Sequence, residues 1–439
     1  MPGLAGKKRR KYHKDKKTGQ ENCMDLYELK EEQERVILVG VQTQDGDDTE
    51  ESLKELEELV KTAGAVTVGM VIQSREAIHP GYYVGTGKLE EIRMAADAYE
   101  ATGIVCDDEL SPSQMNNLER ELGLKIMDRT VVILDIFAAR ANTSEGKIQV
   151  ELAQLRYRAA RLTGMGTSMS RLGGGIGTRG PGEKKLEVDR RLIKTRISQL
   201  KKDLEQVKRH RELLREGRKR ENIRTAAIVG YTNAGKSTLL NTLTDACVLE
   251  EDKLFATLDP TTRVLELPGK QKIYLTDTVG FIRKLPHHLI EAFKSTLEEA
   301  KYADFILHVV DASNPQMEEQ MYVVYETLQE LGVKDKKIVT LFNKQDRLLD
   351  AGIFRDFKAD YVIKTAVKTG QGLDELKAVL EKLLTEDQIY IERVLDYSEA
   401  GQLQIIRKYG QLISEEYTDE GIAVKARVPR DIYGKIGGK

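Results

Sequence analysis

Gly230-Tyr-Thr-Asn-Ala-Gly-Lys-Ser237 lies between a short apolar run, Ala226 to Val229, and a helix-like segment that begins at Thr238. The octapeptide fits the pattern G-x-x-x-x-G-K-[ST], in which a strand is followed by a loop and a helix. Backbone N–H groups of such a loop surround phosphate oxygens, and the helix N-terminus adds partial positive charge. The pattern predicts a phosphate-binding loop in an α/β domain. All eight residues are expected at a nucleotide: Gly230, Tyr231, Thr232, Asn233, Ala234, Gly235, Lys236 and Ser237.

Two residues of this loop carry the charge and the metal chemistry. In phosphate loops of this type the lysine neutralises the β- and γ-phosphates, and the hydroxyl that follows it ligates Mg²⁺. We therefore expect Lys236 to be a catalytic residue and Ser237 to be a magnesium ligand.

A second motif follows forty residues after Ser237, directly behind the apolar run Ile273 to Leu275. An aspartate at the carboxyl end of a strand is placed to hold the metal, usually through water, and a following glycine N–H can reach a γ-phosphate. Asp277 is therefore a predicted metal ligand and Gly280 a predicted catalytic residue. All four residues of the motif are expected at the nucleotide: Asp277, Thr278, Val279 and Gly280.

Two later loops predict which base is bound. Asn343-Lys344-Gln345-Asp346 follows the strand-like run Ile338 to Phe342. Its carboxylate can accept hydrogen bonds from both N1–H and the exocyclic amine of guanine, and adenine has no such pair of donors. The asparagine would support the loop and the lysine stem would stack on the ring. Thr365-Ala366-Val367 lies where a backbone N–H meets guanine O6, so the four motifs in order indicate GTP.

The segment between the first two motifs is expected to respond to the γ-phosphate. Leu254 to Arg263 contains three threonines that compete for one role, which is to complete the magnesium shell: Thr257, Thr261 and Thr262. A loop held in this way is released when the phosphate is lost. The spacing alone does not choose among the threonines.

Two positions bear on hydrolysis. Phe281 stands where many GTPases have a glutamine that positions the attacking water. A phenyl group cannot orient water, so we expect slow hydrolysis by the protein alone, with the missing group supplied by a partner or by another polar residue. Asn233 either ligates K⁺ beside the phosphates or only caps the loop.

Patterns of strands and helices divide the chain around these motifs. Residues 1–34 are expected to form a basic, disordered tail, 35–142 a small α/β domain, and 143–222 an antiparallel helical hairpin. Residues 223–388 would form an α/β P-loop GTPase domain, and 389–439 a small α+β domain.

A short glycine motif precedes the helix expected over 89–99. Gly85-Thr86-Gly87-Lys88 is a strand–helix turn or, as the alternative, part of a second nucleotide site. It lacks the four-residue spacing between the glycine and the Gly-Lys pair, which favours the turn.

The hairpin is predicted from two apolar seams with spacings of four and three residues. The first seam is Ile148, Leu152, Leu155, Ala159 and Leu162, and the second is Ile193, Ile197, Leu200, Leu204 and Val207. Residues 163–183 should form a loop without a core of its own, because eight of them are glycine. The hairpin is therefore expected to hold a basic tip away from the body of the protein.

Charge is distributed unevenly along the chain. The formal net charge of the 439 residues is −2, but residues 1–20 carry +7 and residues 171–220 carry +10, which leaves −19 for the rest. A basic stripe attracts phosphates whatever the total charge is. An RNA partner is expected to be contacted through its phosphates and shape more than through base edges, and no DNA partner is indicated.

Composition excludes several classes of protein. With 40% hydrophobic and 32% charged residues the chain is neither wholly disordered nor collagen-like. No apolar run approaches the ~18 residues that a membrane-spanning helix needs, and no secretory signal is expected. The three widely separated cysteines fit a reducing, cytoplasmic compartment.

The sequence resembles the HflX family of translation-associated GTPases over nearly its whole length. The resemblance rests on the motifs at 230–237, 277–280 and 343–346, on Phe255-Ala-Thr-Leu-Asp259, and on Arg171-Leu-Gly-Gly-Gly-Ile-Gly-Thr-Arg-Gly-Pro-Gly-Glu183 with Asp189-Arg190-Arg191 after it. It implies that Thr257 is the switch threonine, that it is catalytic, and that it shares Mg²⁺ with Ser237. It also implies further nucleotide contacts: Phe255, Ala256, Thr257, Leu258 and Asp259.

The same resemblance implies the partner. Members of the family bind the large ribosomal subunit and act as factors that split or rescue stalled ribosomes. The glycine-rich loop would then reach ribosomal RNA near the peptidyl-transferase centre through Arg171, Gly173, Gly174, Gly175, Gly177, Arg179 and Gly180. We expect a cytoplasmic, monomeric protein with GTP and Mg²⁺ as cofactors.

Two other functions stay open from the sequence. The first is a regulatory or membrane-associated GTPase whose effector is a protein, with the basic tail on an anionic membrane, although no lipidation motif or amphipathic anchor is present. The second is an RNA-binding ATPase.

Overall fold

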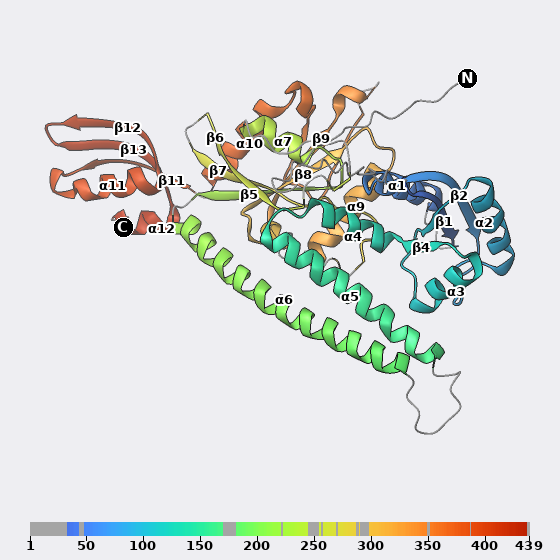
Figure 1. Ribbon diagram of the computed structural model, residues 1–439. Coiled ribbons are helices and arrows are strands. Elements are labelled where there is room, and N and C mark those ends of the chain that lie inside the picture. The colour runs from blue at the N-terminus through green and yellow to red at the C-terminus, as the bar shows by residue number, and fades with distance from the viewer. Residues whose placement is uncertain are drawn as a thin grey trace, which may run out of the picture.

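The computed structural model describes residues 33–43, 48–169, 181–220, 223–244, 254–255, 258–268, 271–286, 289, 298–348, 352–386 and 388–436. Three sheets follow one another along an elongated molecule, and a long helical hairpin runs beneath two of them (Figure 1). The expected architecture is confirmed: an α/β P-loop domain preceded by a small α/β domain and an antiparallel hairpin, and followed by a small α+β unit.

The N-terminal sheet has four parallel strands in the order β2-β1-β3-β4. Its strands and helices are β1 (Arg35–Gln42), α1 (Thr49–Thr62), β2 (Val66–Ser74), α2 (Thr86–Ala98), β3 (Gly103–Cys106), α3 (Pro112–Leu122), β4 (Lys125–Asp128) and α4 (Arg129–Arg140). Residues 36–39 of β1 are consecutively buried, as expected for a central parallel strand with both faces covered.

The first residues of two helices in this unit are defined by their N-caps. Helix α3 begins behind Ser111, whose hydroxyl accepts from the Gln114 N–H in a capping box. Helix α2 begins three residues earlier than expected, because Gly85 is its N-cap and Thr86 is already helical. Gly87 and Lys88 therefore belong to the first turn of a helix.

The hairpin consists of α5 (Ser144–Met169) and α6 (Pro181–Arg220). Both helices are longer than the expected seams, so the loop predicted over 163–183 is too long by residues at each end. Pro181 stands at the first position of α6, which proline favours because its missing N–H would have no partner there. The glycine-rich tip between the helices lies outside the described residues.

Helix α5 does not project freely from the body, as the single predicted seam suggested. It packs against α3 and α4 as well as against α6 (Figure 1). Val150, Ala153 and Tyr157 form a second buried stripe that faces the N-terminal domain. The sequence pattern did not reveal this stripe, because only the seam shared with α6 follows a simple spacing.

The second sheet has the order β10-β9-β8-β5-β7-β6, in which only β6 is antiparallel. Its elements are β5 (Arg224–Gly230), α7 (Lys236–Thr244), β6 (Thr261–Glu266), β7 (Lys272–Asp277), β8 (Phe305–Asp311), α9 (Met317–Glu330), β9 (Lys337–Asn343), β10 (Tyr361–Lys364) and α10 (Leu373–Glu386). The phosphate loop, the aspartate motif and the base motif all follow the carboxyl ends of parallel strands, where such sheets bind ligands.

One hydrophobic cluster joins the first two sheets. It contains residues of β1, α1 and α4 together with residues of β5 and α9, and Phe137, Tyr231, Phe255 and Phe281 lie within it. The two α/β units therefore share a core, and the nucleotide loops are packed against the N-terminal unit.

The C-terminal unit is an antiparallel sheet in the order β11-β13-β12 with short helices beside it. Its elements are β11 (Gln388–Leu395), α11 (Ala400–Tyr409), β12 (Gln411–Thr418), β13 (Gly421–Pro429) and α12 (Arg430–Tyr433). A turn from Thr418 to Gly421 joins β12 to β13. Side chains of β13 alternate in burial, with Ile422, Val424 and Val428 buried.

Candidate nucleotide site

The phosphate loop connects β5 to α7, and its lysine points back across it. Lys236 Nζ donates a hydrogen bond to the Tyr231 carbonyl at 2.7 Å. Burial lowers the pKa of Lys236 to about 8, although the Asp277 carboxylate opposes this change. The ammonium is thus held inside the loop and lacks a full counter-charge, which suits it to an incoming phosphate.

Ser237 and Asp277 meet although they are far apart in the sequence. Ser237 Oγ donates to Asp277 Oδ2 at 2.8 Å, and the Asp277 side chain is fully buried. A hydroxyl and a carboxylate are the hard oxygen donors that Mg²⁺ prefers. The residues present therefore fit a magnesium ion between these two side chains.

The loop after β7 lies directly against the phosphate loop. Thr232 N–H donates to the Phe281 carbonyl at 2.8 Å, and Phe281 N–H donates to the Gly230 carbonyl at 3.1 Å. A Cβ at Gly280 would stand 2.9 Å from Lys236 Nζ, so only glycine permits this approach. The backbone that is expected to sense the γ-phosphate is thus beside the lysine that neutralises it.

Phe281 is buried and cannot orient a water molecule. Its side chain is 2% exposed and belongs to the cluster that joins the two sheets. The neighbouring motif residues are held in the same way, since the Thr278 hydroxyl donates to the Ile228 carbonyl and Val279 is buried in the core. A polar group for the attacking water must therefore come from elsewhere.

Asn343 ties the base loop to the phosphate loop. Its Nδ2 donates to the Ala234 carbonyl at 2.9 Å, and its Oδ1 accepts from the Val367 N–H at 3.0 Å. Lys344 has a left-handed backbone and its ammonium contacts Asp311 Oδ2 at 2.7 Å. Asp346 follows in a short 3₁₀ turn with Gln345 and is exposed, so its carboxylate is open to a base.

The loop at 365–367 differs from the expectation for guanine O6. The N–H groups of Thr365, Ala366 and Val367 all have acceptors within the protein: the Phe342 carbonyl, the Gln371 carbonyl and Asn343 Oδ1. In this conformation a base oxygen would have to share one of these donors. The sequence does not show that the Ala366 N–H is already bonded, because its contact with the Gln371 carbonyl depends on the folded shape of the loop.

The segment after α7 does not bring its described side chains to the phosphate loop. Phe255 and Leu258 are buried in the core shared with the N-terminal unit, and the Asp259 carboxylate accepts hydrogen bonds from the start of α5. These three residues were expected at the nucleotide. The Phe255 ring instead packs against Phe137 of α4, and Asp259 binds Asn142 and Thr143 between α4 and α5.

Two of the three competing threonines lie in strand β6. The Thr262 hydroxyl is hydrogen-bonded to that of Thr276 at 2.9 Å, and Thr261 pairs with Asp277 across the sheet. Thr257, with Ala256, lies outside the described residues. The residues expected to contact RNA, which are Arg171, Gly173, Gly174, Gly175, Gly177, Arg179 and Gly180, also lie outside them.

Comparison with known proteins identifies the family. Three family profiles match consecutive parts of the chain: "GTP-binding GTPase N-terminal" over residues 50–138, "GTP-binding GTPase Middle Region" over 140–218, and "50S ribosome-binding GTPase" over 225–344. The curated relative GTPase HflX of Lacrimispora saccharolytica is 67% identical over 94% of this chain and 97% of its own length. The chain belongs to the HflX family of GTPases.

Two further relatives with the same name support this membership. GTPase HflX of Caldanaerobacter subterraneus is 49% identical over 94% of this chain and 95% of its own. GTPase HflX of Escherichia coli is 43% identical over 90% of this chain and 94% of its own. As an HflX-family protein, the chain hydrolyses GTP.

In this HflX-family site, the motifs did not predict the contacts of the Tyr231 hydroxyl. Tyr231 of the phosphate loop donates its hydroxyl proton to Glu55 of α1 and accepts from the Arg283 N–H at 2.9 Å. Burial, together with the charge on Glu55, raises the pKa of Tyr231, so the hydroxyl remains a donor. One phosphate-loop side chain thus joins the N-terminal unit to the loop after β7.

Arg129 lies beneath this contact and is 1% exposed. Its guanidinium contacts Glu55 Oε2 at 2.8 Å and donates to the carbonyls of Ser52 and Arg283. Burial would lower the pKa of Arg129, but the charges of Glu55 and Asp107 outweigh it and leave the pKa raised. The arginine therefore stays charged within the shared core.

Lys284 completes the contact from the nucleotide domain. Its ammonium contacts Asp107 Oδ2 at 2.6 Å and Asp108 Oδ1 at 2.9 Å, at the carboxyl end of β3. These two carboxylates outweigh burial and raise the pKa of Lys284. The sequence shows Arg129 within an apolar helix and two adjacent aspartates after a strand. It does not show their partners, which lie 74 to 177 residues away.

Proposed function

We propose that this HflX-family GTPase is a molecular switch that binds the large ribosomal subunit through its α5–α6 hairpin and splits or rescues stalled ribosomes. The observation that carries the proposal is the match of its nucleotide domain to the family described as 50S ribosome-binding GTPase. The partner would be ribosomal RNA, and the protein would act as a cytoplasmic monomer.

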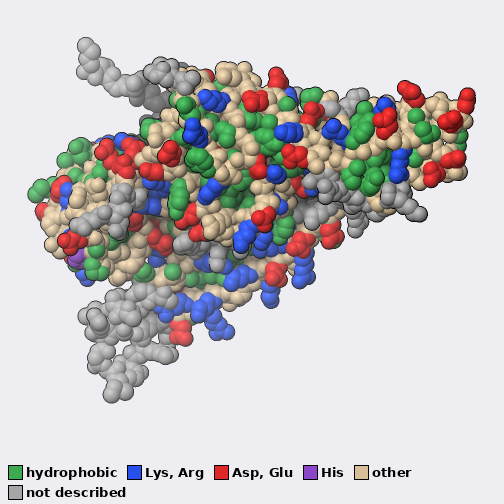
Figure 2. Space-filling view, turned by 180° about the vertical axis from the view of Figure 1, so that it is seen from behind, with side chains coloured by type: hydrophobic (Ala, Val, Ile, Leu, Met, Phe, Trp, Pro, Cys, Tyr) green, Lys and Arg blue, Asp and Glu red, His purple; other side chains and the backbone are tan. Residues whose placement is uncertain are grey.

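The surface of the hairpin supports an RNA partner. The described part of α6 presents exposed cations that recur on one face of the helix: Arg191, Lys194, Lys201, Lys202 and Arg209. Figure 2 shows Lys and Arg side chains gathered along the lower edge of the molecule. Such a row can follow a phosphate backbone without reading its sequence.

The nucleotide cycle can be stated in terms of the chain's own residues. Lys236 would hold the β- and γ-phosphates, the Gly280 N–H would sense the γ-phosphate, and Asp346 would select guanine. Magnesium, held by Ser237 and Asp277 together with Thr257, would neutralise the charge that develops on the transferred phosphoryl group. Loss of that phosphate would release residues 254–263 and 277–284 and weaken ribosome binding.

The burial of Phe281 supports a second element of the proposal, namely that the ribosome completes the catalytic site. The test is the rate of GTP hydrolysis by the full chain alone, with purified large subunits, and with small subunits as the control. We expect GTP hydrolysis to be faster with large subunits than with small subunits or with the full chain by itself. Equal rates under all three conditions would show that the water is positioned by the chain itself.

The alternative is a GTPase that acts on a protein effector at a membrane surface. Among the described residues, no helix is both long and apolar enough to cross a bilayer. The alternative predicts binding to anionic vesicles and none to ribosomal subunits. The proposal predicts the reverse, so sedimentation with each separates them.

A further inference from the structure

Asp259 joins the nucleotide domain to the first turn of the hairpin. Its Oδ2 accepts from the N–H groups of Asn142 and Thr143, at 3.0 and 2.9 Å. Its Oδ1 accepts from the Thr143 hydroxyl. Helix α5 begins at Ser144, so these two amides lie just before the helix. Thr143 is its N-cap, because the Thr143 carbonyl accepts from the Lys147 N–H at 3.0 Å, and a carboxylate at this end is favoured by the helix dipole. A side chain from another domain thus holds the N-cap of α5.

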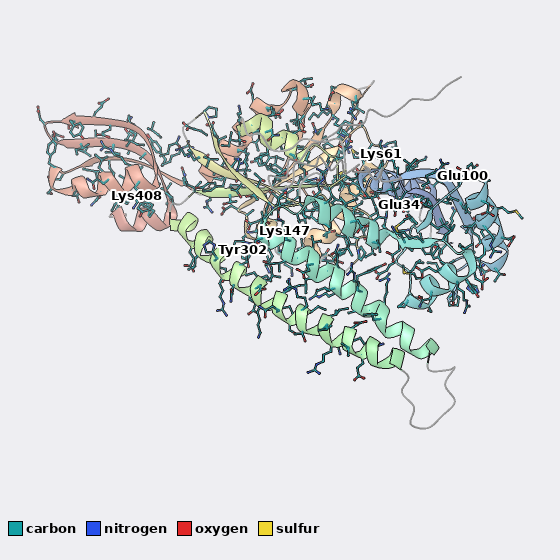
Figure 3. The ribbon with its side chains drawn as sticks, in the orientation of Figure 1. Glu34, Lys61, Glu100, Lys147, Tyr302 and Lys408 are labelled. Atoms are coloured by element: carbon teal, nitrogen blue, oxygen red, sulfur yellow. The ribbon has the colours of Figure 1, made fainter. Side chains whose placement is uncertain are left out.

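Gly146 shows that α5 is shaped to receive this carboxylate. A Cβ at Gly146 would stand 2.4 Å from Asp259 Oδ1, although glycine is otherwise a poor choice for a helix. Thr143 completes the fit, because its Oγ1 accepts from the Gly146 N–H at 3.0 Å while its proton goes to Asp259. Figure 3 marks this root of the hairpin by its label on Lys147, the residue after Gly146.

The same turn of α5 is connected to α6. Glu145 pairs with Arg211, and Arg211 in turn approaches Glu299 at 3.9 Å, just before β8. Both helices of the hairpin therefore meet the nucleotide domain at the place where Asp259 binds. A change at Asp259 would reach α6 as well as α5.

The chain on either side of Thr257 is fixed to the N-terminal half of the protein. The Phe255 ring packs edge-on against Phe137 of α4 with centroids 4.7 Å apart, and Phe255 has a positive φ of 55°. Leu258 is buried in the same core, and Asp259 follows it. A rearrangement of this segment must therefore loosen or tighten the contacts that orient the hairpin.

We propose that Asp259 is a positioning residue that couples the nucleotide state of residues 254–263 to the hairpin by holding Thr143, the N-cap of α5. The proposal rests on the assignment of that segment as a γ-phosphate-responsive loop. When the segment moves, the Asn142 and Thr143 N–H groups gain or lose their acceptor, and the root of the hairpin is held or released. Coupling of this kind is reciprocal, so a ligand that fixes the hairpin also changes nucleotide affinity.

Hydrogen–deuterium exchange of the full chain tests the proposal without a ribosome. Amides 142–150 are compared in saturating GDP and in a non-hydrolysable GTP analogue. The parent should show a nucleotide-dependent difference that Asp259→Asn abolishes, because asparagine has no charge and offers one acceptor oxygen to three donors, the Asn142 N–H, the Thr143 N–H and the Thr143 hydroxyl. In the nucleotide state that protects these amides, the variant should exchange them roughly 2- to 30-fold faster than the parent, the range expected when a helix cap is removed.

Two further variants separate coupling from loss of structure. Gly146→Ala disturbs the same contact from the helix side and should also abolish the difference. Asp360→Asn is the matched control, because Asp360 accepts from the Ile338 N–H at 2.9 Å at the start of β9 in the nucleotide domain, and it should keep the difference. The Asp259→Asn/Gly146→Ala double variant should lose no more than either single variant, since both act on one contact.

The outcomes are decisive in both directions. A parent without a nucleotide-dependent difference at 142–150, or an Asp259→Asn variant with the parental difference, overturns the coupling. A chain that shows the coupling but does not bind large subunits in either nucleotide contradicts the proposed function alone.

Discussion

Asn343 orders two loops of the nucleotide site with a single amide. Its two polar atoms contact the Ala234 carbonyl and the Val367 N–H, so the phosphate loop and the 365–367 loop cannot shift independently. The contacts leave Asp346, three residues later, exposed and open to a base. Base selection therefore depends on that one carboxylate within a loop that is already fixed.

Asp346→Asn tests base selection. The substitution removes an acceptor for the guanine N1–H and exocyclic amine, so we expect affinity for GTP to fall by about one to three orders of magnitude and preference to shift toward xanthine nucleotides. Competition of GTP, XTP and ATP for the same site measures this. Unchanged GTP preference would contradict the assignment.

Asn233 is exposed and has a left-handed backbone, with φ of 60°. If its side chain ligates K⁺, hydrolysis should be faster in K⁺ than in Na⁺, and Asn233→Gly should abolish the difference. Glycine tolerates the same φ, so the variant removes the side-chain oxygen and keeps the loop. Rates in the two salts provide the measurement. A cation effect that survives in Asn233→Gly would assign the residue to capping the loop.

His308 in β8 is buried, and burial lowers its pKa to about 4, against the opposing effect of Asp356. The unfolded chain binds this proton near pH 6.5, so stability contributed by neutral His308 is lost as the pH falls from about 6.5 to 4. The loss should reach about 3 kcal/mol at pH 4. Urea unfolding of the parent and of His308→Gln measures it, and the variant should show a shallower decline. Parallel pH profiles would contradict the assignment.

At the scale of elements, α1, α4 and the loop after β7 form one charged contact around Arg129. Arg129→Met should leave Glu55 and Asp107 without their buried cation and destabilise the protein by about 3–5 kcal/mol. Arg196→Met is the control, because its pair with Glu151 is exposed to water and should contribute little to stability. Urea midpoints compare the two. Similar small effects would mean that Arg129 is not needed to join the units.

The elements show how far a sequence can predict this fold. Strands β5, β7 and β9 and the motifs that follow them were predicted because each depends on a local pattern: an apolar run and a loop of fixed spacing. Helix α5 was predicted with one face only, since its Val150, Ala153 and Tyr157 stripe has partners in α3 and α4 that no local pattern shows.

The same limit applies to the site. Lys236, Ser237 and Asp277 were named from motifs, and the structure brings them together. The roles of Tyr231 and Asp259 were not predicted, because Glu55 and Thr143 lie 176 and 116 residues away in the sequence. Contacts between domains depend on which surfaces meet in the folded protein. The sequence shows which residues are present but not which of them meet.

At the scale of the whole molecule, the net charge of −2 is the sum of regions with opposite charge. The hairpin region from 171 to 220 is strongly positive, and the remainder outside the basic tail is negative. An oriented approach to a polyanion follows, with the hairpin first. Because bound cations release counterions from RNA, affinity should fall steeply as salt rises.

Sedimentation of the full chain with purified large ribosomal subunits tests the central claim most directly. The account predicts strong co-sedimentation with a non-hydrolysable GTP analogue, much weaker co-sedimentation with GDP, and weaker binding as salt is raised. Replacement of Arg191, Lys194, Lys201, Lys202 and Arg209 by glutamine should weaken binding and flatten the salt dependence by about 0.7–0.9 in logarithmic slope for each phosphate that the protein no longer neutralises. Equal binding in GTP analogue and GDP, or binding that salt does not change, would contradict the account.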